Sequence, residues 1–313
     1  MQNGIVYRST GSWYEIKLDN GEFIKARIKG KFRTKQIRTT NPIAVGDFVE
    51  IAKNQSGEFV VNSIKERKNY IIRKSVNLSK EAHIIASNID LAILLVTISS
   101  PVTSPGFIDR FTVTAEAYNI PLLLVFNKID IYNSSDFDKL NEFEKTYNSA
   151  GYNSLRISAN SGDGIEKLNY YIKNKTTLIA GNSGAGKSTL INQLIPSIKL
   201  KTGDISTSHM TGKHTTTFAE MFDMGSNSKI IDTPGIKGFG LVDFKKEELA
   251  LYFPEMIKLL NDCKFHNCKH INEPGCKVIE QLNNGELSVT RYQSYISMYE
   301  QDPENNYRQN IYL

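Results

Sequence analysis

Residues 181–188 (GNSGAGKS) have the spacing G-x-x-x-x-G-K-[ST] of a phosphate-binding loop. The glycines let backbone N–H groups converge on phosphate oxygens, and a helix beginning there adds the positive end of its dipole. Lys187 would reach the β- and γ-phosphates, and the Ser188 hydroxyl would ligate Mg²⁺. A chance glycine-rich turn is the alternative. The apolar strand predicted before the loop and the helix predicted after it weigh against that alternative.

A second motif, Asn127-Lys128-Ile129-Asp130, ends another apolar run and could recognise guanine. An ionised Asp130 can accept two N–H bonds from the N1 and N2 edge of guanine, a donor pair that adenine lacks. Asn127 would contact the base and support the phosphate loop, and Lys128 would pack its stem over the ring. Ser158-Ala159-Asn160 would supply a backbone N–H for guanine O6. Each motif alone could be a surface turn, but together they predict a guanine nucleotide site.

Asp232-Thr233-Pro234-Gly235 follows a third apolar strand and predicts a switch beside the phosphates. Its carboxylate suits the Mg²⁺ water shell, and the Gly235 N–H could sense the γ-phosphate. One of three consecutive threonines, Thr215, Thr216 or Thr217, would close over Mg²⁺, and Thr216 is our candidate. Ras-like GTPases place a glutamine after this motif to orient the attacking water. Here that position is Ile236, which predicts slow intrinsic turnover and dependence on a partner or another polar residue.

The order of these motifs differs from that of ordinary GTPases. The guanine motif lies more than fifty residues before the phosphate loop rather than after it. Since the other parts of a GTPase are present, the order predicts a circular permutation. It also places the Asp232 switch shortly before the C-terminal region, so we expect nucleotide state to move that region.

A metal site is predicted there by Cys263, Cys268, His270 and Cys276, which follow C-x₄-C-x-H-x₅-C and include all three cysteines of the chain. Three thiolates and an imidazole make a closed, tetrahedral, structural zinc site, which would supply much of the folding free energy of this short segment. His266 is a competing ligand, and reduced, packed thiols are the alternative to any metal. Tyr292, Tyr295 and Tyr299 recur at helical spacing; a packing face is favoured over stacking on RNA.

The elements that must position these residues fall into three groups, which predict domains at 1–70, 71–240 and 241–313. The first contains short alternating strands with turns between them, such as Asn20-Gly21, and favours a barrel of the oligonucleotide-binding (OB) type, with another small barrel as the alternative. The second alternates apolar strands with helices, as parallel sheets buried on both faces do. The third is helical around the Cys/His cluster. The fold class is therefore multidomain α/β.

Charge and composition suggest where the protein acts and on what. The 313-residue chain has a net charge of +5, and residues 1–68 hold 13 Lys/Arg against 7 Asp/Glu, so the remainder is nearly neutral. A basic module favours a polyanionic partner such as RNA, although a solvated basic surface is the alternative. The chain shows no signal peptide and no apolar run long enough for a membrane span, and its odd cysteine count opposes a disulfide framework. We therefore expect a cytoplasmic protein without a membrane partner.

The motif order and the flanking modules together resemble the ribosome small subunit-dependent GTPase A family over essentially the whole chain. The resemblance implies GTP hydrolysis stimulated by the small (30S) ribosomal subunit, contact with its 16S rRNA, and a role in late maturation of that subunit. It also implies bound Mg²⁺ with GTP, one structural Zn²⁺, and a monomer. His214, within Lys213-His214-Thr215-Thr216-Thr217, resembles the switch motif of the family and is the candidate water-positioning residue beside Lys187, although it could merely pack or contact the partner. The family spacing favours His270 over His266.

The residues assigned to each site follow from the motifs and the resemblance. Mg²⁺ is assigned to Ser188, Thr216 and Asp232, and zinc to Cys263, Cys268, His270 and Cys276. GTP is assigned to Asn127, Lys128, Ile129, Asp130, Ser158, Ala159, Gly181, Asn182, Ser183, Gly184, Ala185, Gly186, Lys187, Ser188, Thr189 and Gly235.

Three other functions fit parts of this pattern. The first is an RNA-binding assembly factor whose nucleotide only regulates affinity. The second is a P-loop ATPase or nucleotide kinase, against which the guanine motif argues. The third is a GTPase acting on another RNA, since basic charge recognises phosphate and not the identity of the RNA.

Overall fold

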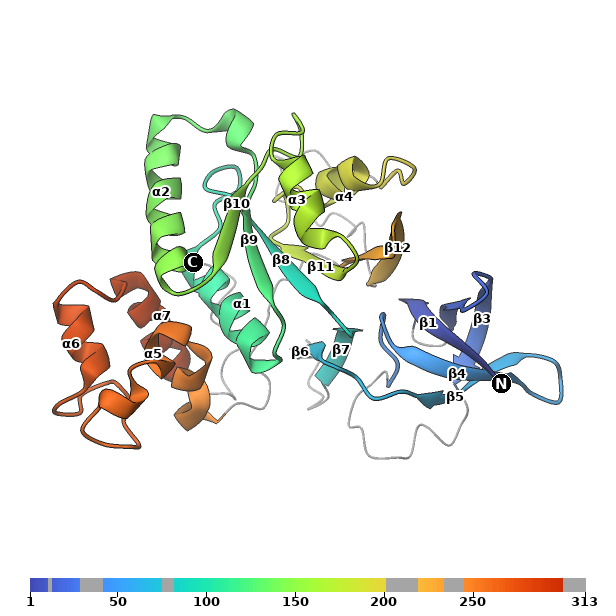
Figure 1. Cartoon of the computed structure of the whole chain (residues 1–313), viewed down its shortest axis with the longest axis horizontal. Coiled ribbons are helices and arrows are strands. Elements are labelled where there is room, and N and C mark those ends of the chain that lie inside the picture. The colour runs from blue at the N-terminus through green and yellow to red at the C-terminus, as the bar shows by residue number, and fades with distance from the viewer. Residues whose placement is uncertain (11–12, 29–41, 75–81, 201–218, 234–244, 301–313) are drawn as a thin grey trace, which may run out of the picture.

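A computed structural model of the chain describes residues 1–10, 13–28, 42–74, 82–200, 219–233 and 245–300. Three bodies follow one another along the chain (Figure 1): an N-terminal barrel, a central sheet covered by helices, and a helical C-terminal module. Among the helices of the described ranges, none is long and apolar enough to cross a membrane.

The barrel consists of β1 (Gln2–Ser9), β2 (Tyr14–Leu18), β3 (Phe23–Ile28), β4 (Phe48–Lys53) and β5 (Phe59–Ile64). β1 pairs with both β2 and β4, β3 pairs with β5 in parallel, and β4 pairs with β5, so the ring closes in the order β1-β2-β3-β5-β4. A five-stranded barrel confirms the expected OB type. Its core includes Val6, Ile16, Val49 and Val61, all fully buried. The basic stretch from Lys29 to Arg38, for which the sequence predicts a loop on the barrel, lies outside the described residues.

The central sheet has the order β10-β9-β8-β11-β13-β12, formed by Asn153–Arg156, Leu122–Phe126, Leu91–Val96, Thr176–Gly181, Ser228–Asp232 and Glu220–Gly225. All neighbouring strands are parallel except β12, which runs antiparallel to β13. A separate hairpin, β6 (Tyr70–Lys74) with β7 (Ala82–Ser87), joins the barrel to this sheet.

Helices cover both faces of the sheet. Alternate residues of β8 and β9 point to opposite sides, so Leu94 and Phe126 belong to one core and Leu95 and Val125 to the other. The first core is covered by α1 (Pro105–Ala117) and α2 (Ser134–Ser149), and the second by α3 (Ile165–Ile172) and α4 (Lys187–Leu194). Burial on both faces explains why these strands are continuous apolar runs in the sequence.

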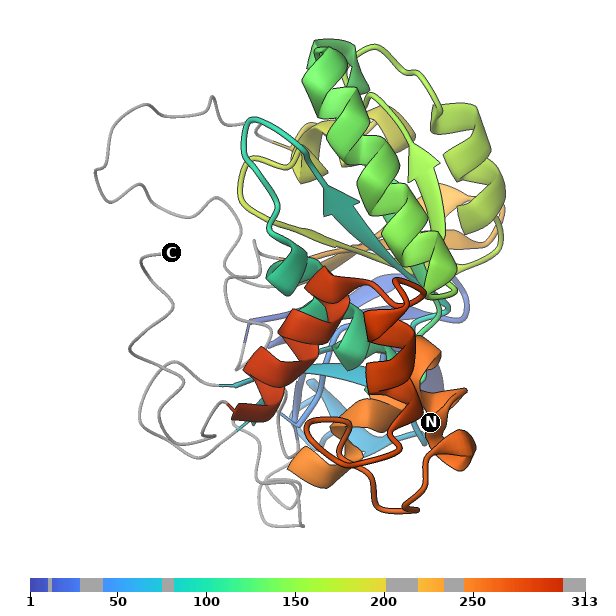
Figure 2. The same cartoon turned by 90° about the vertical axis from the view of Figure 1, so that its left-hand side faces the viewer.

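The C-terminal module contains η3 (Lys246–Tyr252), α5 (Pro254–Ile257), η4 (Leu260–Asp262), α6 (Lys277–Asn283) and α7 (Val289–Glu300). It packs against α1 (Figure 2), and its apolar core includes Val113 of that helix. Tyr295 is buried in this core and Tyr292 and Tyr299 pack against it, which confirms the packing face expected for the three tyrosines.

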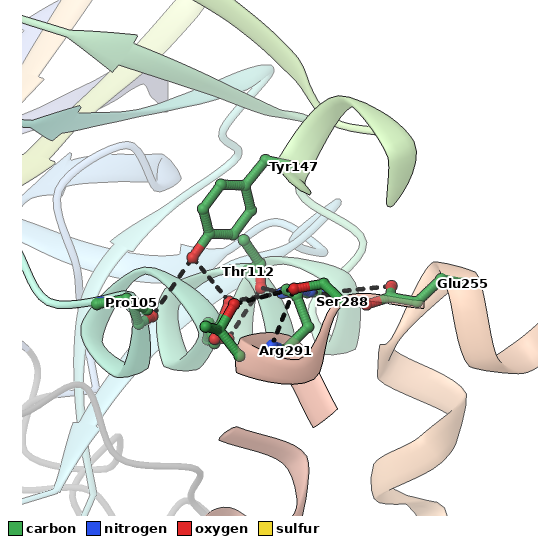
Figure 3. A network of polar contacts seen from close by, with 8 residues as sticks. Pro105, Thr112, Tyr147, Glu255, Ser288 and Arg291 are labelled. Atoms are coloured by element: carbon green, nitrogen blue, oxygen red, sulfur yellow. Dashed lines mark hydrogen bonds and ion pairs between the residues drawn. The ribbon is translucent and has the colours of Figure 1, made fainter. Parts of the chain in front are cut away.

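A buried arginine joins this module to the central domain (Figure 3). Arg291 of α7 is 1% exposed and donates to Asp109 Oδ1 at 2.8 Å and to Thr112 Oγ1 at 3.0 Å, both on α1. Its other donors bind the two carboxylate oxygens of Glu255 at 2.7 and 3.0 Å. Tyr147 of α2 also donates to Asp109 Oδ1, at 2.9 Å. The guanidinium fork therefore binds two helices at once.

Candidate nucleotide site and metal centre

The motifs selected from the sequence meet at one edge of the central sheet. Strands β8, β9, β10, β11 and β13 are parallel, so their carboxyl ends all lie at this edge. Residues 127–130, 158–160, 181–188 and 232–233 each follow one of those ends. Open α/β sheets bind ligands in the crevice outside the carboxyl ends of their strands. The fold thus brings together motifs that lie as far apart in the sequence as Asn127 and Asp232.

Asn127 holds three of these loops together. Its side chain is 1% exposed, donates through Nδ2 to the carbonyl of Ala185 at 2.8 Å, and accepts through Oδ1 from the Ala159 N–H at 2.9 Å. Gly186 lies against it with φ +96°, and a Cβ there would come within 2.5 Å of Asn127 Nδ2. Glycine is therefore required at 186 both by the backbone conformation and by the close approach of the side chain.

The carboxylate predicted to recognise guanine is exposed and oriented by its neighbours. Ser158 Oγ donates to Asp130 Oδ1 at 2.6 Å, and Asn160 Nδ2 lies 3.5 Å from Asp130 Oδ2. The Ser161 N–H in turn donates to Ser158 Oγ at 3.0 Å. The hydroxyl of Ser158 thus fixes the rotamer of Asp130, a role that the sequence did not predict for it.

Lys187 and the phosphate loop have the geometry of an anion site. Lys187 Nζ donates to the carbonyls of Gly181 and Asn182 at 2.7 and 3.0 Å. Burial lowers the pKa of Lys187, and the nearby Asp232 opposes that effect. Helix α4 begins at Lys187 and its N-cap, Gly186, offers no side-chain acceptor. The first N–H groups of the helix are therefore available to phosphate oxygens, and Ser188 and Thr189 stand in the same first turn.

Asp232 ends β13 beside the phosphate loop. The residue is 4% exposed, and burial raises its pKa to about 6, with Lys187 lowering it and Glu220 raising it further. Thr233 Oγ1 donates to the carbonyl of Ile179 at 3.0 Å and holds the end of β13 against β11. A buried carboxylate facing a lysine near phosphate-binding N–H groups has the chemistry of a magnesium ligand. Gly235, Thr216 and His214 lie outside the described residues.

The segment 98–101 forms a wall of the site that the sequence did not indicate. Lys128 Nζ donates to the Ser100 carbonyl, and a Cβ on Gly184 of the phosphate loop would lie 3.3 Å from Pro101. Lys128 has φ +71°, so the chain turns sharply between Asn127 and Asp130. The predicted stacking lysine is thus bound at its tip to the loop that follows β8.

The Cys/His residues form a compact cluster in the C-terminal module. Cys263, Cys268, His270 and Cys276 are all buried, and their ligand atoms lie within 4.8 Å of one another. His270 Nδ1 is 3.7 Å from Cys263 Sγ and 3.4 Å from Cys276 Sγ. Tetrahedral zinc with Zn–S and Zn–N bonds of about 2.3 and 2.1 Å would place its ligands roughly 3.6 Å apart. The cluster could therefore hold a metal ion such as zinc through His270 Nδ1, whereas the competing His266 is exposed and outside it.

Without a cation, burial in the cluster favours neutral thiols. Burial raises the pKa of Cys268 to about 12, with Cys276 as a further cause, and burial also raises the pKa of Cys276. A bound cation would lower these values by stabilising the thiolates. The Lys277 N–H lies 3.4 Å from Cys263 Sγ, and the hydroxyls of Tyr292 and Tyr295 donate to the carbonyls of His270 and Lys269. Helix α7 therefore braces the ligand loop.

Comparison with known proteins agrees with this architecture. The family model described as the RsgA N-terminal domain matches residues 3–61, and that of the RsgA GTPase matches residues 64–242. A protein of Christiangramia forsetii named "Small ribosomal subunit biogenesis GTPase RsgA" is 52% identical over 312 residues, covering 99% of both chains. A protein of Flavobacterium psychrophilum with the same name is 53% identical over 312 residues, covering 99% of this chain and 95% of its own.

Two solved structures share the fold across the whole length. YjeQ from Thermotoga maritima matches with a TM-score of 0.75 and 33% identity, covering 95% of this chain and 97% of its own. YloQ, described as a circularly permuted GTPase, matches with a TM-score of 0.71 and 27% identity, covering 96% of this chain and 94% of its own. The chain belongs to the RsgA GTPase family and is a circularly permuted, GTP-hydrolysing enzyme.

Proposed function

We propose that this GTPase acts in the maturation of the small ribosomal subunit, to which it binds and from which GTP hydrolysis releases it. The observation that carries the proposal is the full-length match, at about half identity, to proteins named for that process. The guanine motif, the phosphate loop and Asp232 lie together at one sheet edge, as the chemistry requires. Contact with 16S rRNA is supported by the excess of positive charge in residues 1–68.

The nucleotide site that we propose uses the residues assigned from the sequence. Asp130 would accept the guanine N–H groups, residues 181–189 would bind the phosphates, and Ser188, Thr216 and Asp232 would hold Mg²⁺. Mg²⁺ would neutralise charge that develops on the β- and γ-phosphates. Ile236 cannot orient water, so we propose His214 for that role. Retention of subunit-stimulated turnover by His214→Ala would refute it.

We further propose that the cluster of Cys263, Cys268, His270 and Cys276 holds one structural Zn²⁺. The support is the burial and spacing of the four ligand atoms. Metal analysis of freshly purified protein tests this, and an absence of stoichiometric zinc would refute it. We also propose that the chain divides into domains at 1–70, 71–240 and 241–313. We further propose a monomeric state and a cytoplasmic location.

The decisive experiment measures GTP turnover with and without purified 30S subunits. We expect slow turnover alone and a large stimulation by 30S, because the intrinsic site has no glutamine after the Asp232 motif. Lys187→Ala should abolish both rates, which controls for contaminating GTPases. Stimulation by 50S subunits or by tRNA to the same extent would favour a GTPase of another RNA.

A second candidate function is an assembly factor in which nucleotide only regulates affinity. The absence of a glutamine at position 236 favours it, since hydrolysis would then be incidental. The test measures release of the protein from 30S subunits in the presence of GTP and, separately, in the presence of a non-hydrolysable analogue. Equal release in both would support this alternative, and release only with GTP would oppose it.

A further inference from the structure

We propose that Tyr132 is a positioning residue for the guanine nucleotide site, because its hydroxyl separates the ends of strands β8 and β9. The residue lies two positions after Asp130, beyond the motif that the sequence singled out. It is half-buried, and its ring packs edge-on against Phe137 with centroids 5.9 Å apart. The inference rests on the proposed GTP site and concerns the spacing of the two strand ends that border that site.

The hydrogen bonds of the two strands show what the hydroxyl does. β8 and β9 pair in parallel as far as Val96 and Phe126, and the Asn127 N–H still donates to the Val96 carbonyl at 2.9 Å. In a parallel pair of strands, a residue whose N–H donates to the neighbouring strand also accepts, at its carbonyl, from the N–H two residues further along that strand. The next bond would join the Ile98 N–H to the Asn127 carbonyl.

Tyr132 occupies the place of that bond. The Ile98 N–H donates to Tyr132 Oη at 2.8 Å, and Tyr132 Oη donates to the Asn127 carbonyl at 2.6 Å. One hydroxyl therefore satisfies both backbone groups while keeping them apart. Burial raises the pKa of Tyr132 to about 12, so the hydroxyl keeps the proton that it donates. The hydroxyl is thus inserted between the two chain segments, at the edge where the nucleotide motifs meet.

Both strands leave this point as walls of the site. Directly after β9, Asn127 joins the phosphate loop to residue 159, and Lys128 follows it. After β8, Ile98 leads into Ser99 and Ser100, whose groups contact Asp136 and Lys128. Within the guanine motif, Tyr132 bonds to the backbone carbonyls of Asn127 and Ile129 rather than to their side chains. It acts through Asn127 and Ile98, by setting the distance between the guanine motif at 127–130 and the segment 98–101.

Tyr132→Phe tests this role because it removes the hydroxyl and keeps the ring. Either two buried backbone groups lose their partner, or the strands close and bond directly, and both outcomes displace Asn127. We expect the Kd for GDP and for a non-hydrolysable GTP analogue to rise about 5- to 30-fold, as for one or two lost hydrogen bonds. KM for GTP should rise by the same factor, and kcat at saturating GTP should stay within about twofold. Tyr170→Phe on α3, where the ring is 83% exposed, is the matched control.

Amide hydrogen exchange gives a second measurement that is independent of catalysis. The Ile98 amide should exchange faster in Tyr132→Phe than in the wild type if the strand end frays. Unchanged affinity together with unchanged Ile98 exchange would overturn the inference while leaving the GTPase proposal intact. A loss of melting temperature and of active fraction, with the same Kd at the remaining sites, would also overturn it, since that pattern reflects stability alone. Wild-type protein that binds no guanine nucleotide would overturn both.

Discussion

Asp232 is both buried and ionisable, and without a bound cation its burial opposes its ionisation. The side chain is almost fully buried beside Lys187, and its pKa is raised to about 6 by burial. A buried carboxylate is costly when ionised, even with a lysine nearby. A cation would recover that cost, so the residue is suited to Mg²⁺ and destabilising without it.

Asp232→Asn should therefore stabilise the unliganded protein at neutral pH and abolish turnover. The wild-type carboxyl binds its proton more tightly when folded, so its contribution to stability falls as pH rises from about 4 to about 6 and stays low above that window. A shift of about two pKa units limits the gain at pH 7.5 to about 3 kcal/mol. Urea unfolding in EDTA at pH 4.5 and 7.5 measures the difference in unfolding free energy between Asp232→Asn and the wild type. Asp138→Asn, at an exposed position, is the control. A variant whose advantage did not grow with pH would contradict the assignment.

Individual site residues differ in how far the sequence could reveal them. The motif residues are visible because phosphate and guanine chemistry needs fixed residue types at fixed spacing. Tyr132 was not visible, since its role depends on the backbone groups of Ile98 and Asn127, which are distant in the sequence and are brought together by the sheet. His270 and His266 both have suitable side chains; the family spacing favoured His270, and the folded loop shows that it is His270 that faces the thiols.

At the scale of elements, buried strands were predicted well and edge elements poorly. The apolar run before the guanine motif, Leu122 to Phe126, is readable as a strand in the sequence because both faces of β9 are buried, and β9 has these bounds. β12 (Glu220–Gly225) and the hairpin β6–β7 were not expected. β12 is the outermost strand of the central sheet, next to β1 of the barrel, and contains acidic residues, methionines and a glycine. Its own sequence therefore favours a strand only weakly, and its pairing with β13 decides.

Arg291 adds a buried polar contact to the apolar packing that attaches the C-terminal module to α1. Its partners Asp109 and Glu255 come from different bodies, and Asp109 is fully buried. Burial raises the pKa of Asp109, and Arg291 lowers it. Removing the arginine would leave that carboxyl buried without its cation, which is a strongly destabilising change.

Arg291→Met should accordingly destabilise the docked module by about 3–5 kcal/mol. Urea unfolding followed by hydrogen exchange of α1 and α7 would locate the loss at their contact (Figure 3). Lys277→Met in the same module removes an exposed ion pair with Glu280 and should leave the free energy of unfolding nearly unchanged. Equal effects of the two substitutions would show that the buried network contributes no more than a surface pair.

At the scale of the whole molecule, both flanking bodies contact elements that adjoin the nucleotide site. The permutation led us to expect the C-terminal module to respond through the segment after Asp232, much of which lies outside the described residues. The structure shows a second connection through α1. This helix begins shortly after segment 98–101 and contacts Arg291 of the C-terminal module through Asp109. Hydrogen exchange that is identical in GTP-analogue and GDP forms across 245–280 would argue against such a response.

The barrel contacts the central sheet through β12. Arg8 of β1 pairs with Glu220 of β12, while Tyr7 Oη and Lys17 Nζ both donate to Asp223 at 2.6 Å. Although partial burial opposes it, the bonds from Lys17 and Tyr7 lower the pKa of Asp223, which therefore stays ionised at neutral pH. β12 forms a hairpin with β13, whose last residue is Asp232. A shift of Asp232 on binding Mg²⁺ and the γ-phosphate would thus reach the barrel through two paired strands.

Asp223→Ala should weaken this connection without altering the nucleotide site. We expect the GDP affinity and the basal turnover to stay within about twofold, because Asp223 belongs to neither the base nor the phosphate motifs. The affinity ratio for 30S between GTP-analogue and GDP forms, typically 5- to 150-fold in coupled systems, should fall toward one. Glu66→Ala, an exposed acidic position near the barrel, controls for the charge change. If Asp223→Ala kept the wild-type ratio, the barrel would have to sense nucleotide through another contact or not at all.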